Sequence, residues 1–386
     1  MSSPSEAASG PLRRYATRTR LARAWSARGP RVNLVLLALL VKVVLIGLAL
    51  ALYGAGPDPF TALGRLWDQW DAEHYLYLAA HGYSAAGDAR NLIAFFPLYP
   101  ALIAAVAATG LPLRLAALLI SNISGIVAAI LLYEVARLDR DEPQAWRAAA
   151  FFTVFPTAYF LLVGYTEALF CALTFGSVLA ARRQRWLASG LLGGLAAAAR
   201  LTGLALLPFL VVELWLARER LKALASFLLA PVLVLLGFLT YLVTNWLVLG
   251  SPLAFIAVQQ AHWSHSLAAP WVGLADAIRS ISRRGLWQKV TVGAGEIAGG
   301  FAAYATATLS WLRLRRSDAA YATALTIMIT FLPFWLSIPR YLLSLYPLFL
   351  LVGGITHRGR YLVLVGASSI GLIVFAMAFG RGYWAF

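Results

Sequence analysis

The stretch VNLVLLALLVKVVLIGLALALYG, residues 32–54, is apolar except for Asn33 and Lys42. A helix needs roughly 20 mostly apolar residues to cross the hydrocarbon core of a bilayer, so this stretch is long enough to span a membrane. Similar runs recur along the chain, which has 386 residues, of which 61% are hydrophobic and only 12% charged. A soluble protein carries about a quarter charged residues. The composition therefore predicts an all-α integral membrane protein and excludes a soluble enzyme or a fibrous protein.

The chain has 32 basic and 16 acidic residues, which gives a net charge of +16. The basic residues do not form one patch, so we expect no nucleic-acid partner; they lie in short clusters between apolar runs, as in cytoplasmic loops. Residues 1–31 hold the first cluster and are expected to form a disordered cytoplasmic tail that binds membrane lipids weakly. Cys171 is the single cysteine, so an intramolecular disulfide is excluded; it lies in an apolar run.

The later basic clusters divide the apolar runs into pairs. If every cluster is cytoplasmic, the runs between two clusters must cross the membrane and return. The expected crossings after 115–136 are 147–163 with 167–181, 186–199 with 201–217, 223–249 with 290–312, 319–337 with 341–356, and a last run at 361–379. The prediction is a bundle of about eleven transmembrane helices formed by residues 32–386. Its two long extracytoplasmic loops are 55–110, with juxtamembrane helices, and 250–289.

The apolar segment 92–109 does not fit this alternation as a full crossing. It is short and carries Pro97 and Pro100, and proline interrupts a helix. We interpret it as a juxtamembrane or re-entrant segment. The competing interpretation keeps it as a true crossing, which would move the loop at Arg137 outside and Glu167 inside.

The stretch GRLWDQWDAEHYLYLAAHGY, residues 64–83, combines acids and histidines with tryptophans and tyrosines. As a helix it would place Trp70 and His74 on one side, with Asp71 and Tyr75 flanking them. An aromatic belt with solvated acids is one interpretation. The other is functional, because an unpaired charge near the bilayer is costly and a carboxylate there can act as a general base.

Four motifs in order resemble the PIG-V-type mannosyltransferases: WDQWDAEHYLYLAAHGY at 67–83, FFPLYP at 95–100, YTEALF at 165–170 and AAARLTGLALLP at 197–208. That family belongs to the GT-C superfamily of polytopic glycosyltransferases. The resemblance implies a GT-C-like fold, a catalytic acid in the first extracytoplasmic loop, and inverting transfer from a polyprenyl-phosphate sugar. The matching acid is Asp71, with Asp68 as the near alternative.

Other charged residues are candidates for contact with substrate. Glu167 caps the next helix in one interpretation, and in the other orients the acceptor or holds a metal ion. Arg200 and Arg340 lie at predicted outer turns and match a phosphate leaving group, although either could instead anchor a helix end at the interface. The predicted substrate-binding residues are Asp68, His74, Tyr75, Glu167, Arg200, His262, Arg340 and Tyr341.

Two further groups favour no single interpretation. His262 and His265 have the spacing of metal ligands but lack a third ligand, so contact with a headgroup or sugar, or a plain loop, is favoured over a metal site. Glu296 lies in an apolar run, where an acid indicates either a transport path or a hydrogen bond to a neighbouring helix.

The resemblance, together with these residues, implies a mannosyltransferase that moves a hexose from polyprenyl-phosphate-mannose to a glycan or glycolipid acceptor on the extracytoplasmic side. A divalent cation is an open option. The alternatives are a lipid or sugar transporter, with Lys42, Arg200 and Glu296 as pathway charges, and a non-catalytic assembly subunit. A composition rich in Ala, Leu and Arg is typical of bacteria with G+C-rich genomes, so the expected location is a bacterial plasma membrane.

Overall fold

The computed structural model describes residues 29–54, 62, 64, 66–217, 224–264 and 266–386. Within these residues every regular element is a helix, as the composition predicts. Nearly all of the predicted tail at 1–31 lies outside the described residues, and so does the basic cluster at 218–222.

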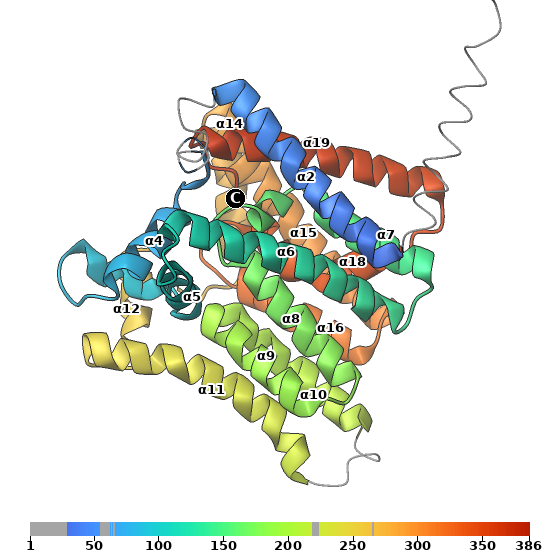
Figure 1. Ribbon diagram of the computed structural model, residues 1–386, viewed down its shortest axis with the longest axis horizontal. Coiled ribbons are helices and arrows are strands. Elements are labelled where there is room, and N and C mark those ends of the chain that lie inside the picture. Colours follow the sequence, from blue (N-terminus) through green and yellow to red (C-terminus); the bar gives the residue numbers. More distant parts are fainter. Residues whose placement is uncertain (1–28, 55–61, 63, 65, 218–223, 265) are drawn as a thin grey trace, which may run out of the picture.

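The helices follow one another with short connections (Figure 1). The first group is α2 (Pro30–Tyr53), α4 (Asp71–His81), the 3₁₀ helix η1 (Asp88–Ala94), α5 (Leu98–Ala107), α6 (Leu113–Arg137), α7 (Glu142–Thr153), η2 (Ala158–Leu161), α8 (Glu167–Arg182), α9 (Trp186–Ala199), η3 (Leu201–Ala205) and α10 (Leu206–Ala217). The second group is α11 (Leu224–Leu249), α12 (Ala254–Ala261), α13 (Pro270–Arg283), α14 (Leu286–Gln288), the π-helix η5 (Lys289–Gly295), α15 (Glu296–Arg313), α16 (Arg316–Thr330), α17 (Ile338–Tyr341), η6 (Leu342–Ser344), α18 (Tyr346–Gly353) and α19 (Arg358–Gly380).

Four described helices are long and apolar enough to cross a membrane: α2, α6, the segment Leu228–Leu249 of α11, and α19. The bent pair η1 and α5 would raise the number to five if it is one span. The chain is therefore a multi-pass membrane protein. Eleven crossings stay a prediction, because the other predicted crossings consist of shorter helices such as Trp186–Ala199 and Leu201–Ala217.

Prolines divide two of the predicted crossings. The run 147–163 is not one helix: α7 ends at Thr153, Pro156 follows, and η2 begins at Ala158. The run 319–337 likewise ends its helix at Thr330, three residues before Pro333. Proline lacks the N–H that continues a helix, and broken helices are tolerated in membranes only where protein surrounds them.

The segment 92–109 is bent in the structure. The helices η1 and α5 meet at an angle of 109° close to Pro97, which excludes a straight span over these residues. Both a broken crossing and a re-entrant segment have this shape, so its path relative to the membrane stays a prediction.

The helix α8 lies at the centre of the bundle, against α6 on one side and α9 on the other (Figure 1). All its residues except Leu169 and Arg182 are buried. Next to it, α9 packs closely on α11, and a Cβ placed on Gly237 would lie 1.9 Å from the carbonyl oxygen of Gly194. Small residues allow membrane helices to approach in this way. The contacts of α9 with α8 and with α11 fix α9 in the bundle, and the C-terminus of α9 thereby lies near the N-terminus of α8.

Candidate active site

Four charged residues from distant parts of the sequence meet at the ends of helices. Asp71 begins α4, Glu167 begins α8, Arg200 follows the last residue of α9, and Arg340 lies in α17. Arg340 Nη1 donates a hydrogen bond to Asp71 Oδ2 at 2.8 Å, across 269 residues of sequence. We refer to these four residues as the acid–arginine cluster.

Glu167 connects the two arginines of the cluster. Its Oε1 lies 3.2 Å from Arg340 Nε and also accepts a hydrogen bond from Arg200 Nη1. The same Arg200 nitrogen donates to Thr166 Oγ1 at 2.8 Å. Two carboxylates thus face two guanidinium groups. A buried charge is costly unless it is paired, and here the pairing is mutual.

Both arginines of the cluster remain charged. Burial alone would lower the pKa of Arg340, but the carboxylates of Glu167 and Asp71 raise this pKa well above its ordinary value. Burial also opposes the charge of Arg200, and Glu167 again raises its pKa overall. The cluster therefore offers two permanent cations to an anionic ligand.

The two acids of the cluster differ in access. The Asp71 side chain is 23% exposed, whereas that of Glu167 is 5% exposed. Glu167 also pairs with both arginines, while Asp71 binds only Arg340 among the described side chains. Asp71 is therefore the carboxylate that a substrate can reach, and Glu167 holds the arginines.

Aromatic rings form the walls around the guanidinium groups. The carbon at the centre of the Arg200 guanidinium lies 4.9 Å from the ring centroid of Tyr341, and that of Arg340 lies 5.7 Å from the same ring. Arg340 also lies 5.3 Å from the ring of Phe160 and 5.5 Å from that of Tyr165. Cations over aromatic faces are stabilised by the ring quadrupole, so these contacts fix the direction of both arginines.

Hydrogen bonds position the start of α4. The Tyr165 hydroxyl accepts from the backbone N–H of Asp71 at 3.1 Å and donates to the carbonyl of Gln69 at 2.8 Å. The Tyr75 hydroxyl lies 3.4 Å from Thr166 Oγ1. Thr166, the residue before α8, makes no capping hydrogen bond to that helix.

Two residues beside the cluster, neither of them glycine, have a positive backbone φ angle. Trp70, just before Asp71, has φ +54°, and Ser337, at the start of α17, has φ +67°. Residues other than glycine seldom adopt such angles, and strain of this kind gathers at functional sites. Glu296 supports the second turn, since its carboxylate accepts the backbone N–H groups of Ser337 and Ile338 at 2.7 and 2.8 Å.

Three predicted substrate-binding residues lie apart from the cluster. Asp68 pairs with Arg114, and burial raises the pKa of Asp68. His74 packs against the rings of Phe95 and Trp263, with centroids 5.1 and 5.9 Å away. His262 packs against Trp263 at 5.3 Å. No hydrogen bond, ion pair or ring contact joins any of the three to the acid–arginine cluster within the described residues.

The described part of the chain contains no group of three or more His, Cys, Asp or Glu side chains that could hold a metal ion. His265 lies outside the described residues, so the predicted pair with His262 is not described. Tyr165 and Thr166 position Asp71 and Arg200 but are not among the predicted site residues. Both adjoin Glu167 in YTEALF, so the motif itself was the available signal.

The described chain is an all-α multi-pass membrane protein with a buried acid–arginine cluster where its helices end. The family model described as mannosyltransferase (PIG-V) matches residues 61–261, more than half of the chain. The chain therefore belongs to the PIG-V mannosyltransferase family. The matched range contains Asp71, Glu167 and Arg200, and Arg340 lies beyond it.

Curated relatives carry the same assignment. The rat protein GPI alpha-1,6-mannosyltransferase 2 is 38% identical over 162 residues, which cover 39% of this chain and 32% of the relative. The human protein of that name is 36% identical and covers 39% and 31%. GPI mannosyltransferase 2 of Drosophila pseudoobscura is 30% identical over 126 residues, covering 30% and 27%. The chain thus matches about a third of the length of these relatives.

Solved structures are more distant. The apo oligosaccharyltransferase of Archaeoglobus fulgidus superimposes with a TM-score of 0.47 at 13% identity, covering 92% of this chain and 56% of that one. Its complex with zinc and sulfate gives the same TM-score at 14% identity, covering 89% and 53%.

Proposed function

We propose that this chain is a membrane mannosyltransferase of GT-C architecture, with about eleven crossings and its acid–arginine cluster on the extracytoplasmic side. The donor is a polyprenyl-phosphate mannose and the acceptor a glycan or glycolipid. Membership of the PIG-V family supports the reaction class, and the relatives named GPI mannosyltransferases support a glycolipid acceptor. The relatives cited are animal proteins, so they lend no support to the bacterial membrane expected from composition.

The observation that carries the proposal is one accessible carboxylate, Asp71, paired with the buried Arg340, with a second arginine, Arg200, held beside them by Glu167. Asp71 accepts the proton of the acceptor hydroxyl as its oxygen attacks the anomeric carbon. The new C–O bond forms on one face while the bond to the phosphate oxygen breaks on the other, which inverts the configuration. The lipid phosphate leaves with the bonding electrons, and its negative charge is stabilised by Arg340 and Arg200.

The contacts of other buried charges argue against the transporter alternative. Lys42 Nζ donates to the carbonyl of Leu161 at 2.5 Å, next to the break after η2. Glu296 binds two backbone N–H groups of the α17 turn. Lys42 and Glu296 thus each bind backbone groups at a point where a helix is interrupted, and Arg200 is paired with Glu167. A transport path needs charges that a substrate can reach, whereas these have internal partners.

The test of the proposal is mannose transfer by the purified protein. The protein is incubated with polyprenyl-phosphate-mannose and a panel of glycan and glycolipid acceptors, and products are identified by mass. Asp71→Asn keeps the shape and removes the base, so we expect a loss of about 10²–10⁴-fold in rate. Asp68→Asn is the matched control, because Asp68 pairs with Arg114 outside the cluster. No transfer by the wild type, or equal small losses in both variants, would refute the proposal.

A further inference from the structure

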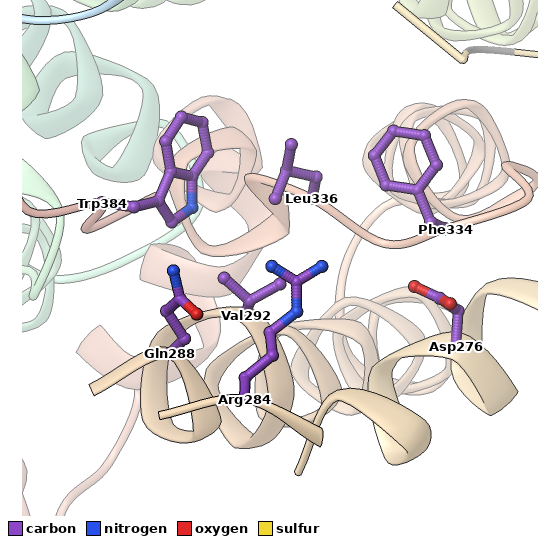
Figure 2. A pocket seen from close by; sticks show the side chains of 7 residues that line it. All are labelled: Asp276, Arg284, Gln288, Val292, Phe334, Leu336 and Trp384. Carbon is purple, nitrogen blue, oxygen red and sulfur yellow. The ribbon is translucent and has the colours of Figure 1, made fainter. Parts of the chain in front are cut away.

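A second site candidate lies beside the acid–arginine cluster. It is a cavity of about 280 Å³ between α13, α14, η5, the connection before α17 and the C-terminal segment (Figure 2). Its lining residues are Asp276, Arg284, Gln288, Val292, Phe334, Leu336 and Trp384. None of these residues belongs to the predicted site. Phe334 and Leu336 lie just before α17, which carries Arg340, and Trp384 lies in the C-terminal segment.

The cavity contains hydrogen-bond donors without partners. Trp384 Nε1 is buried and has no partner among the described residues. Arg284 and Gln288 are exposed residues that make no hydrogen bond or ion pair to any described side chain, and Figure 2 shows both directed toward Trp384 and Leu336. The N–H of Trp384, buried without an acceptor, costs free energy, and such groups in native structures call for an explanation.

The remaining lining shows what chemistry could satisfy these donors. Val292, Phe334 and Leu336 present apolar surface, and Asp276 adds one carboxylate, which also lies 3.4 Å from Arg279. Ligand sites combine apolar walls with a few placed polar groups in this way. A sugar ring has C–H groups on its faces and oxygens around its edge. It therefore matches a cavity with apolar walls and three converging N–H donors.

The cavity is linked to the proposed base through two tryptophans. The rings of Trp384 and Trp70 meet edge to face, with centroids 5.3 Å apart, and Trp70 directly precedes Asp71. Trp287 Nε1 holds Trp384 in place by donating to its carbonyl at 2.8 Å. On the other wall, Leu336 precedes Ser337, which begins the turn that carries Arg340.

We propose that this cavity binds the sugar ring of the acceptor, a proposal that rests on the proposed mannosyltransferase function. The base acts on the acceptor, and the cavity adjoins the residue before the base. The arginines that would hold the donor phosphate lie instead around Tyr341 and Glu167. The acceptor class is therefore a hexose or hexose-containing glycan whose ring hydroxyls accept from Arg284, Gln288 and Trp384.

The first experiment measures sugar binding without turnover. The melting temperature of the purified protein is recorded with methyl α-mannoside, methyl glucoside and methyl galactoside at millimolar concentration, because a ligand that binds the folded state raises it. We expect at least one sugar to raise the melting temperature of the wild type and of Arg283→Gln, but not of Arg284→Gln. Arg283 is the matched control: it is an exposed neighbour outside the cavity. No shift in the wild type, or equal shifts in both variants, overturns the proposal.

The second experiment separates acceptor from donor. In the transfer assay, Arg284→Gln should raise the acceptor KM about tenfold, the loss expected for one hydrogen bond from a charged donor, with the donor KM unchanged. Trp384→Phe keeps the ring and removes Nε1, and should raise the acceptor KM by a smaller factor. A rise in the donor KM alone assigns the cavity to the donor and overturns the proposal. Absence of transfer by the wild type refutes the enzyme function, while the melting experiment still decides whether the cavity binds a sugar.

Discussion

Arg340 is the residue on which both acids of the site converge. Its Nη1 binds Asp71 and its Nε faces Glu167, so one planar group makes two contacts in different directions. A lysine ammonium is a single point of charge on a flexible chain and cannot reproduce such a fork. The geometry thus requires arginine at this position, where a helix-end anchor at the membrane surface would accept lysine equally well.

We expect Arg340→Lys to lower the rate of mannose transfer by at least tenfold even though the charge is kept, and Arg340→Ala to lower it further. The control is Arg381→Lys, since Arg381 lies over the ring of Tyr53, 5.0 Å from its centroid, where any cation suffices. Transfer rate and donor affinity are measured at matched expression. Wild-type behaviour of Arg340→Lys would contradict a role for the guanidinium in holding phosphate.

The residue types of the cluster could be predicted from sequence, but their pairing could not. Asp71, Glu167, Arg200 and Arg340 each stood out as a charge near the end of an apolar run. Asp68 was a candidate for the same reason, yet its carboxylate forms an ion pair with Arg114 instead. The positive φ of Trp70 separates the two aspartates, and no local pattern predicts such an angle for tryptophan.

At the scale of elements, the turn at α17 depends on an acid from another helix. Glu296 begins α15 and accepts two N–H groups at the start of α17, which would otherwise be buried without partners. The sequence left two interpretations of Glu296, a transport path or a hydrogen bond to a neighbouring helix, and the structure shows hydrogen bonds to the start of α17. Its partner lies 41 residues later along the chain, so its role as a cap could not be deduced from spacing.

Glu296→Gln should weaken this turn. The amide keeps one accepting oxygen, and its NH₂ group faces the second N–H, so one hydrogen bond is lost at a cost of about 1–3 kcal/mol. We expect a lower melting temperature together with a severalfold lower transfer rate, because Arg340 follows in the same turn. Glu142→Gln, in the exposed first turn of α7, serves as the control and should change neither quantity.

The contact between α9 and α11 gives a prediction on packing. A methyl group on Gly237 would collide with the backbone of Gly194, whereas one on Gly366 in α19 would meet no atom within 4 Å. Gly237→Ala should therefore lower the melting temperature and the activity, because α9 leads into Arg200. Gly366→Ala should be neutral or stabilise by about 0.5–1 kcal/mol, as alanine favours a helix. Equal melting temperatures for the two variants would contradict the close approach of the helices.

The helix count shows a limit of sequence analysis at this scale. Hydropathy predicts where apolar runs lie, and the long helices α2, α6, α11 and α19 agree with it. It predicts some breaks and misses others: the expected division of the runs 186–199 and 201–217 agrees with the end of α9 and the start of η3, whereas the run 147–163, expected as one crossing, is divided at Pro156. The Arg200 break is held by Thr166 and Glu167, and both come from another element.

At the scale of the molecule, α8 connects two groups of charges. Glu167 lies at its first residue, and at its last residue Arg182 pairs with Asp318 at 3.0 Å, Glu213 at 3.2 Å and Asp139 at 3.0 Å. An acid at the N-terminus and a base at the C-terminus both suit the helix dipole. The predicted topology would assign these two groups to opposite faces of the membrane.

Labelling with a membrane-impermeant thiol reagent tests that topology. The background is Cys171→Ala, which removes the only native thiol, itself buried. We expect Tyr77→Cys, on the exposed side of α4, to react from outside, and Leu138→Cys, after α6, to react only in opened membranes. Labelling of position 138 but not of position 77 in intact cells would invert the topology and move the acid–arginine cluster to the cytoplasm.

The charge neutrality of the acid–arginine cluster has a consequence for the order of events in the proposed reaction. Without a donor, Arg340 occupies one oxygen of Asp71. An arriving lipid phosphate competes for the same guanidinium, and by taking it frees Asp71 to meet the acceptor. The donor must then bind first, and a donor-free enzyme presents an occupied carboxylate to any hydroxyl that enters. Each departure of the spent lipid phosphate would close the ion pair again and return the protein to its resting state.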